Sequence, residues 1–264
     1  MARALVLVSI LLLGLPLATR GQSYGGGPDS QSPAAQPPAA TDPDDLVTPP
    51  AGTPEHDRRA PVATAVRLDG AIELDGRLDE PVWSTAPAAD RFVQREPEEG
   101  VEPTQRTEVR FAYDDETLYI GARMFEDAGP AGITARLVRR DVYAESDQLS
   151  IFLDPYLDHT RQVVFRVNPA GVRIDENNGD TSWDPVWRAR TRVDSLGWTA
   201  ELAIPFSQLR FDAGDDRTWG LQIGREINRI NEHQVWSFWR RDQQGGPQRY
   251  GHLTGISAPK AGVG

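Results

Sequence analysis

The chain has 264 residues, of which 25% are charged, and it carries a net charge of −11 at pH 7. It contains no cysteine, which excludes disulfides and thiol chemistry, so its stability has to come from an apolar core and any bound ions. The acidic residues are spread along the chain and no lysine-rich run occurs, which argues against nucleic acid as a partner.

Residues 1–22 have the pattern of a secretory signal peptide. Arg3 precedes an apolar run from Ala4 to Leu17, and small and polar residues follow. The run is shorter than the roughly 20 residues of a membrane-spanning helix. No cysteine follows it, which excludes a lipoprotein anchor. We therefore expect a bacterial protein that is exported to the periplasm, the outer membrane or the outside of the cell.

Residues 23–60 are dominated by Pro, Ala, Gly, Ser and Asp, and they contain scarcely any large apolar side chain. Such a segment cannot bury enough apolar surface to offset its ordering entropy, so it is predicted to be a disordered linker. Residues 61–258 are long enough for one domain with a real core. Residues 259–264 remain as a tail.

Short alternating runs bounded by Gly, Asp, Asn and Pro recur after residue 61 and predict a mostly β fold. TEVRFAYDDETLYIGARMF reads as an antiparallel hairpin with a turn at Asp114–Thr117. A helical turn is expected at Pro205–Leu209. These features predict an antiparallel β-sandwich of the jelly-roll or immunoglobulin-like kind with one or two short helical turns. The further strands are expected at Gln148–Asp154, Gln162–Asn168, Val186–Val193, Trp198–Ile204, Trp219–Glu226 and Val235–Trp239.

Seven segments carry a resemblance when taken in order: LDGRLDEPVW, EVRFAYDDETLYIGARM, SDQLSIFLDPY, VVFRVNPAG, GWTAELAIPFSQL, WGLQIGREI and YGHLTG. Together they resemble a family 9 carbohydrate-binding module over about Val66 to Ile256. The form that they resemble most is the diverged one that precedes a predicted outer-membrane β-barrel in exported bacterial proteins. The resemblance implies a sugar-binding β-sandwich without catalytic activity, with calcium in its loops and two tryptophans that clamp the sugar.

The clamp is only partly present. Tyr143 stands where the resemblance places the first tryptophan, and QQGGPQ, just before Tyr250, stands where it places the second. Flat aromatic rings with polar neighbours suit pyranose rings. Trp83, Trp198 and Trp219 are expected in the core. The other aromatic residues that could serve are Tyr143, Trp183, Trp187, Trp236, Trp239 and Tyr250. Of these, the predicted carbohydrate-binding residues are Tyr143, Trp183, Trp239 and Tyr250. Tyr143 is the first choice.

Two loops, DPYLDH and DENNGDTSWD, concentrate the oxygen ligands that calcium prefers, although neither has the spacing of an EF-hand. Turn formation is the simpler explanation of such loops. The calcium hypothesis names Asp154, Asp158, Asp175 and Asp180 as ligands.

The segment LDGRLDEPVW could supply an acid pair for glycoside hydrolysis. A turn at Gly76, with Asp75 and Asp79 bonded to backbone amides and Trp83 buried, is the preferred interpretation.

Arg188, Arg190 and Arg192 alternate on one strand face, where an anionic glycan could bind. Pairing with acids such as Glu201 is the favoured alternative. His159, His233 and His252 are expected to be isolated packing or surface residues.

We therefore predict an exported, non-catalytic module that binds a polysaccharide or oligosaccharide through loop aromatics. One alternative is a structural or interaction domain of an outer-membrane assembly that has lost sugar binding, with a β-barrel or another envelope protein as its partner. A second alternative is an accessory part of a glycoside hydrolase in polysaccharide catabolism.

Overall fold

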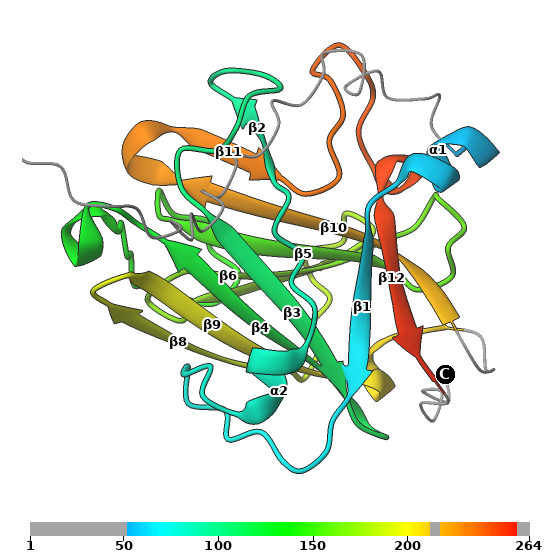
Figure 1. Ribbon diagram of the computed structural model, residues 1–264, viewed down its shortest axis with the longest axis horizontal. Helices are drawn as coiled ribbons and strands as arrows, with labels where there is room; N and C mark the ends of the chain where they lie inside the picture. Colours follow the sequence, from blue (N-terminus) through cyan, green and yellow to red (C-terminus); the bar gives the residue numbers. More distant parts are fainter. Residues whose placement is uncertain (1–51, 212–216, 258–264) are drawn as a thin grey trace, which may run out of the picture. The chain divides into compact units, whose positions relative to one another are not determined.

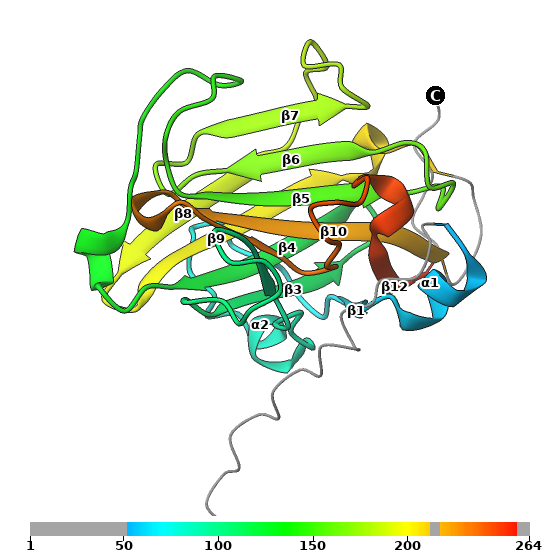
Figure 2. The same ribbon diagram turned by 90° about the horizontal axis from the view of Figure 1, so that it is seen from above.

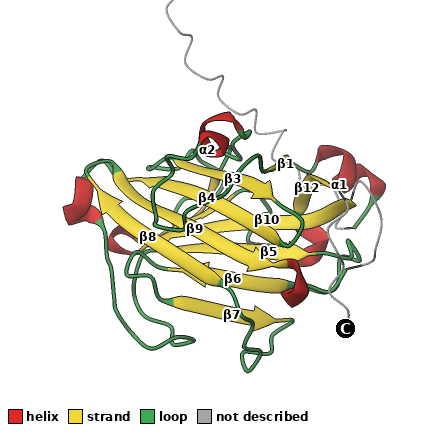
Figure 3. Cartoon of the chain, turned by 90° about the horizontal axis from the view of Figure 1, so that it is seen from below, coloured by secondary structure: helices red, strands yellow, loops and turns green. Residues whose placement is uncertain are grey.

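The computed structural model describes residues 52–211 and 217–257. The predicted signal peptide, the predicted linker up to residue 51 and the predicted tail lie outside the described residues. Strands are the main regular elements of the described chain, and the helices are short (Figure 3). The strands are β1 (Val62–Arg67), β2 (Val93–Glu96), β3 (Thr107–Tyr113), β4 (Thr117–Phe125), β5 (Gln148–Asp154), β6 (Val163–Val167), β7 (Arg173–Asn177), β8 (Arg188–Asp194), β9 (Gly197–Pro205), β10 (Arg217–Ile227), β11 (Glu232–Val235) and β12 (Gly251–Ile256).

The helical segments are each a few residues long. The α-helices are α1 (Pro54–Arg59) and α2 (Pro81–Thr85), and the 3-10 turns are η2 (Gly129–Gly132), η3 (Phe206–Gln208), η4 (Asn228–Ile230) and η5 (Pro247–Arg249). Helix α1 lies inside the segment that composition predicted to be linker. Its N-cap residue Thr53 accepts a hydrogen bond from the His56 amide. Turn η3 falls within the predicted helical turn.

Two sheets form the fold, and strand β1 belongs to both (Figure 1). The β5 sheet has the order β7-β6-β5-β10-β12, with β11 paired to β10 and β2 paired to β11. The β4 sheet has the order β3-β4-β9-β8. Residues Val62–Thr64 of β1 pair with β12, and Ala65–Arg67 pair with β3. Strand β1 therefore crosses from one sheet to the other at a corner of the fold.

The prediction of a wholly antiparallel sandwich was wrong in one respect. Strand β1 runs parallel to both β12 and β3, so the sheet is mixed. The hairpin signals in the sequence report pairings between neighbouring strands, whereas β1 pairs with a strand from the far end of the chain. The other pairings between named strands in the described residues are antiparallel.

The two sheets lie in separate layers and enclose the core (Figure 2). Alternate residues of each strand point inward, as Leu149, Ile151 and Leu153 do on β5. Trp198 and Trp219 are fully buried, which confirms their predicted place in the core. Apolar burial of this kind is the main stabilising contribution in a protein without disulfides.

Most of the predicted strands are present. The hairpin of β3 and β4 pairs Thr107 with Met124 through to Tyr113 with Leu118. The predicted strand at Val235–Trp239 was wrong in position, because β11 covers Glu232–Val235 and the chain then leaves the sheet, burying Trp236. Strand β7 was not predicted, since its residues were assigned to an acidic loop.

Candidate functional site

The LDGRLDEPVW segment seals the outer face of the β4 sheet. Gly76 takes the left-handed conformation that the predicted turn requires, with φ of 86°. Trp83, on α2, is 3% exposed and lies directly over Gly121 of β4, where an added Cβ atom would come within 2.8 Å of the indole. The segment therefore acts as a structural cover.

A buried carboxylate anchors this cover. Glu201, on β9, is 0% exposed and accepts hydrogen bonds from the backbone amides of Asp75 (3.0 Å) and Gly76 (2.8 Å). Its other oxygen accepts a hydrogen bond from the Trp83 indole at 3.0 Å. Burial, with a smaller contribution from Glu80, raises the pKa of Glu201 to about 7 against the opposing effect of these hydrogen bonds. The group is enclosed and cannot reach a substrate.

The predicted pairing of the arginine stripe with Glu201 is wrong. Arg190 lies directly opposite Glu201 in the β8–β9 ladder, but the Glu201 oxygens are taken by the cover. Arg188, Arg190 and Arg192 are exposed, and none of them forms an ion pair within 4.0 Å among the residues that the structure describes. They stand as a solvated row on the free edge of the β4 sheet.

The β5 sheet is exposed on its outer side at one place, beside Tyr143. Tyr143, in the loop before β5, has 59% of its surface exposed. It borders a shallow, open hollow of about 360 Å³, called the cavity from here on. The cavity is lined by Tyr143, Ala144, Glu145, Ser146, Glu226 and Asn228.

Arg166, on β6, supports the Tyr143 ring. Its guanidinium carbon lies 5.5 Å from the centre of that ring and 5.3 Å from the centre of the Phe152 ring. An ion pair of 3.4 Å with Glu176 neutralises it. The aromatic ring is therefore backed by a cation that already has a carboxylate partner.

Glu226 is one of the polar residues of the cavity that the sequence did not predict as site residues. On β10, Leu221, Ile223 and Arg225 point into the protein, so the alternate residues, ending with Glu226, point outward. Gly224 precedes it on the same face and leaves space there, since an added Cβ atom would meet only ordinary contacts at 3.6 Å or more. Period-two alternation with a glycine in the strand interior was the available signal.

The Glu226 carboxylate forms no hydrogen bond or ion pair with another described residue, although it is partly buried. Burial raises its pKa, and the charge of Arg166 opposes that rise. Gln148 lies directly opposite on β5 with 5% of its surface exposed, and its side-chain oxygen has no partner in the described structure. Two acceptors without donors thus share this face.

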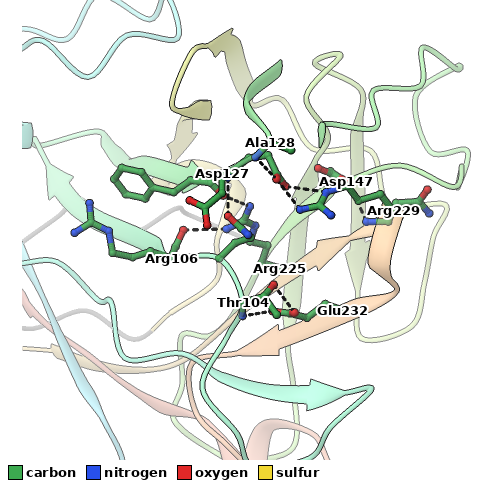
Figure 4. A network of polar contacts seen from close by, with 12 residues as sticks. Thr104, Arg106, Asp127, Ala128, Asp147, Arg225, Arg229 and Glu232 are labelled. Carbon is green, nitrogen blue, oxygen red and sulfur yellow. Dashed lines mark hydrogen bonds and ion pairs between the residues drawn. The ribbon is translucent and has the colours of Figure 1, made fainter. Parts of the chain in front are cut away.

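A buried polar network fixes the inner side of the same strand (Figure 4). Arg225 donates to the carbonyl oxygens of Arg106 (2.9 Å) and Phe125 (2.6 Å) and to the Thr107 hydroxyl (3.0 Å). The carboxylate of Asp147 accepts a hydrogen bond from the Asn228 amide at 2.9 Å. These contacts hold the end of β10, and with it the cavity wall, in place.

The other predicted carbohydrate-binding residues lie elsewhere or are covered. Trp183 packs edge-on against the core residue Phe165, with ring centres 5.8 Å apart. Trp239 lies under Arg95, with 4.8 Å between the guanidinium carbon and the ring centre. Trp187 and Trp236, two of the other aromatic residues, are buried.

Tyr250 is linked to Tyr143 through two intervening residues, Phe152 and Arg166. Its ring centre is 6.2 Å from that of Phe152, which shares Arg166 with Tyr143. Tyr250 is 3% exposed, however, and its hydroxyl donates to Gln162. It supports the site from below, and only Tyr143 of the four predicted residues presents its ring to solvent beside the cavity.

Asp154 and Asp158, two of the predicted calcium ligands, shape the turn after β5. Asp154 is buried and accepts hydrogen bonds from the amides of Tyr156 (3.3 Å) and His159 (2.8 Å). Slight burial opposes the charge on Asp158, but hydrogen bonds from Thr160 and Arg161 outweigh it and lower its pKa to about 2.

Asp175 and Asp180 also have protein partners. Asp175, on β7, is fully buried and accepts from the Trp187 indole (2.8 Å) and from Arg140 (2.7 Å). Asp180 accepts from the Ser182 amide at 2.9 Å. Within residues 52–211 and 217–257 no group of three or more His, Asp or Glu residues is arranged to hold a metal ion. Calcium stays a prediction.

The histidines are less isolated than expected. The Nε2 atoms of His159 and His252 each lie 3.9 Å from the same Asp57 oxygen. His56, beside Asp57 on α1, forms a 3.2 Å hydrogen bond with the Tyr250 carbonyl. The cluster ties α1 to the sandwich.

In the described part of the chain, no helix has the length and apolarity needed to cross a membrane.

Comparison with known proteins agrees with this architecture. The model of the carbohydrate family 9 binding domain-like family matches residues 74–254. A family 9 carbohydrate-binding module from Caldicellulosiruptor kristjanssonii, solved with cellotriose, is 15% identical, with a TM-score of 0.54 over 75% of this chain and 95% of that one. Its complex with glucose gives 13% identity and a TM-score of 0.50 over 74% and 96% of the two chains.

A crystal structure from Bacteroides uniformis ATCC 8492 has 13% identity and a TM-score of 0.55 over 75% of this chain and 100% of that chain. At these identities the structural likeness concerns the fold alone. A search of curated proteins found no match.

Proposed function

The chain belongs to the carbohydrate family 9 binding domain-like family, and from this premise we propose that it binds an oligosaccharide at the cavity beside Tyr143 without transforming it. The observation that carries the proposal is the exposed Tyr143 ring. Arg166 lies over this ring, and the ring stands at the edge of a polar cavity. The solved relatives with cellotriose and glucose support a sugar as the class of ligand.

The chemistry of the cavity suits a pyranose ring. An aromatic face packs against the apolar face of the sugar, and polar groups beside it exchange hydrogen bonds with the hydroxyls. Glu226 accepts such bonds, and the Asn228 side-chain amide can both donate and accept. The single exposed ring replaces the two-ring clamp that the family resemblance implied, so we expect modest affinity.

We further propose that the module is exported, as residues 1–22 predict, and that the segment up to residue 51 tethers it. A calcium ion in the loops at Asp158 or Asp180 is part of the same proposal. Repeating the titration described below with calcium and then with chelator tests it, since a structural ion would change the affinity or the melting temperature.

The direct test is calorimetric titration of the full chain with cellotriose, glucose and acidic oligosaccharides. Saturable binding is expected, and Tyr143→Ala should weaken it at least about tenfold, or ~1.4 kcal/mol. Tyr156→Ala is the matched control, because Tyr156 also lies under an arginine, Arg161, at 4.4 Å but does not line the cavity. A folded protein that binds none of these sugars would favour the alternative of an interaction domain.

A further inference from the structure

Carboxylates outnumber cations around the Tyr143 cavity. Glu145 and Glu226 line the cavity, and Glu176 acts on Tyr143 from β7. Arg166 is the cation that acts on the same ring, and it is already paired with Glu176. The cavity itself therefore presents two carboxylates without a cation of their own.

No other cation is available to Glu226 from the strands beside it. Its partner across the β10–β11 pair is His233, whose pKa is lowered mainly by burial, which disfavours a positive charge on this ring. Its partner on β5 is Gln148, which offers a buried oxygen acceptor that lacks a donor. The nearest arginine on the same strand, Arg225, points inward and donates to the buried network (Figure 4).

We infer that this cavity selects glycans that carry a free, protonated amino group, with Glu226 as the residue that recognises the amine. The inference rests on the proposed function and names the class of sugar for the same site. An ammonium group has three donors and no acceptor, which complements the Glu226 carboxylate, an acceptor at the cavity that has no donor in the described structure. Charge-assisted hydrogen bonds of this kind are roughly twice as strong as neutral ones.

The alternatives fit less well. A neutral sugar could donate hydroxyl hydrogen bonds to Glu226, but it would leave the partly buried charge uncompensated. A uronic acid would place a third carboxylate beside Glu145 and Glu226 without a free cation to meet it. The net charge of −11 adds to this order, since the field of the whole chain attracts cations and repels anions. The expected order of affinity is amino sugar, then neutral sugar, then acidic sugar.

The test uses trisaccharides that differ mainly at one substituent. Cellotriose carries a hydroxyl at carbon 2, the chitosan trimer carries an ammonium group there, and triacetylchitotriose carries a neutral acetamide. The full chain should bind the chitosan trimer at least about tenfold more tightly than cellotriose, by calorimetry at low salt and at a pH where the amine is protonated. The preference should shrink in high salt.

Glu226→Gln keeps the shape and removes the charge, so it should reduce the preference for the chitosan trimer to about twofold or less. Glu73→Gln is the matched control, because it removes the same charge from an exposed position just before the LDGRLDEPVW segment, and it should leave the preference unchanged. Melting curves of both variants establish that they are folded.

Equal affinity for cellotriose and the chitosan trimer would overturn the inference and leave the proposed function standing. A preference that survives in Glu226→Gln would also overturn it, since long-range attraction alone would then be the cause. Failure of all three sugars to bind the folded protein would overturn both.

Discussion

The two outer faces of the sandwich each hold a glutamate whose pKa is raised by burial, yet the two residues differ in their partners. Glu201, on the β4 sheet, meets three donors and is enclosed by the LDGRLDEPVW cover. Glu226, on the β5 sheet, meets no donor in the described structure and lies at a cavity. A raised pKa alone does not distinguish a structural carboxylate from a binding one; its hydrogen-bond partners do.

The largest expected effect comes from opening the covered face. Trp83→Ala should lower the free energy of unfolding by about 3–5 kcal/mol, because it removes a buried indole and leaves a cavity over Gly121. Denaturant unfolding measures this loss. Leu196→Ala is the control, since Leu196 is 58% exposed and its truncation should change stability by about 0.5 kcal/mol or less. A similar small loss for Trp83→Ala would contradict the structural role of the cover.

A smaller effect is expected from Glu201→Gln. An amide has one acceptor oxygen, so it cannot satisfy all three donors that now meet Glu201, and an unpaired buried donor costs about 1–3 kcal/mol. We expect a loss of about that size at pH 5.

The same variant tests the pH dependence. Because burial raises the pKa of Glu201 from 4.5 to about 7, the folded protein holds a proton in that range that the unfolded chain has released. Wild-type stability should therefore fall as the pH rises from about 4.5 to 7. Glu201→Gln lacks this group, so its stability should depend less on pH, and unfolding curves at several pH values measure the difference. An unchanged slope would show that Glu201 does not titrate in this window.

These two faces also show what the sequence could predict. The covered face could be predicted from the sequence, because Gly76 marks a turn and Trp83 is a large apolar residue in the same segment. The fold was readable for the same reason, since alternation and turn residues are local signals. The parallel pairing of β1 was not readable, because its partners β12 and β3 are set by the chain's global path.

The face of the β5 sheet that carries the cavity could be predicted only in part. Tyr143 was predicted through the family resemblance and does lie beside the cavity, whereas Tyr250 is buried beneath Phe152. Alternation could have placed Glu226 on the outer face of β10. That its carboxylate has no donor depends on which side chains the neighbouring strands bring to it, and this information is three-dimensional.

The smallest expected effect is that of Glu226→Gln on stability, and its sign distinguishes the two faces. A partly buried carboxylate without a donor costs free energy, so neutralising it should leave stability at pH 7 unchanged or raise it by up to about 1 kcal/mol. The raised pKa of Glu226 implies that wild-type stability falls as the pH rises above about 4.5, the ordinary glutamate value. The variant should lack that part of the slope in the same unfolding curves.

If Glu226→Gln instead destabilised the protein as Glu201→Gln should, Glu226 would be a structural residue with partners in the folded chain. A neutral or stabilising result is what a binding residue predicts, because such a group is kept for its ligand at a cost to the free protein.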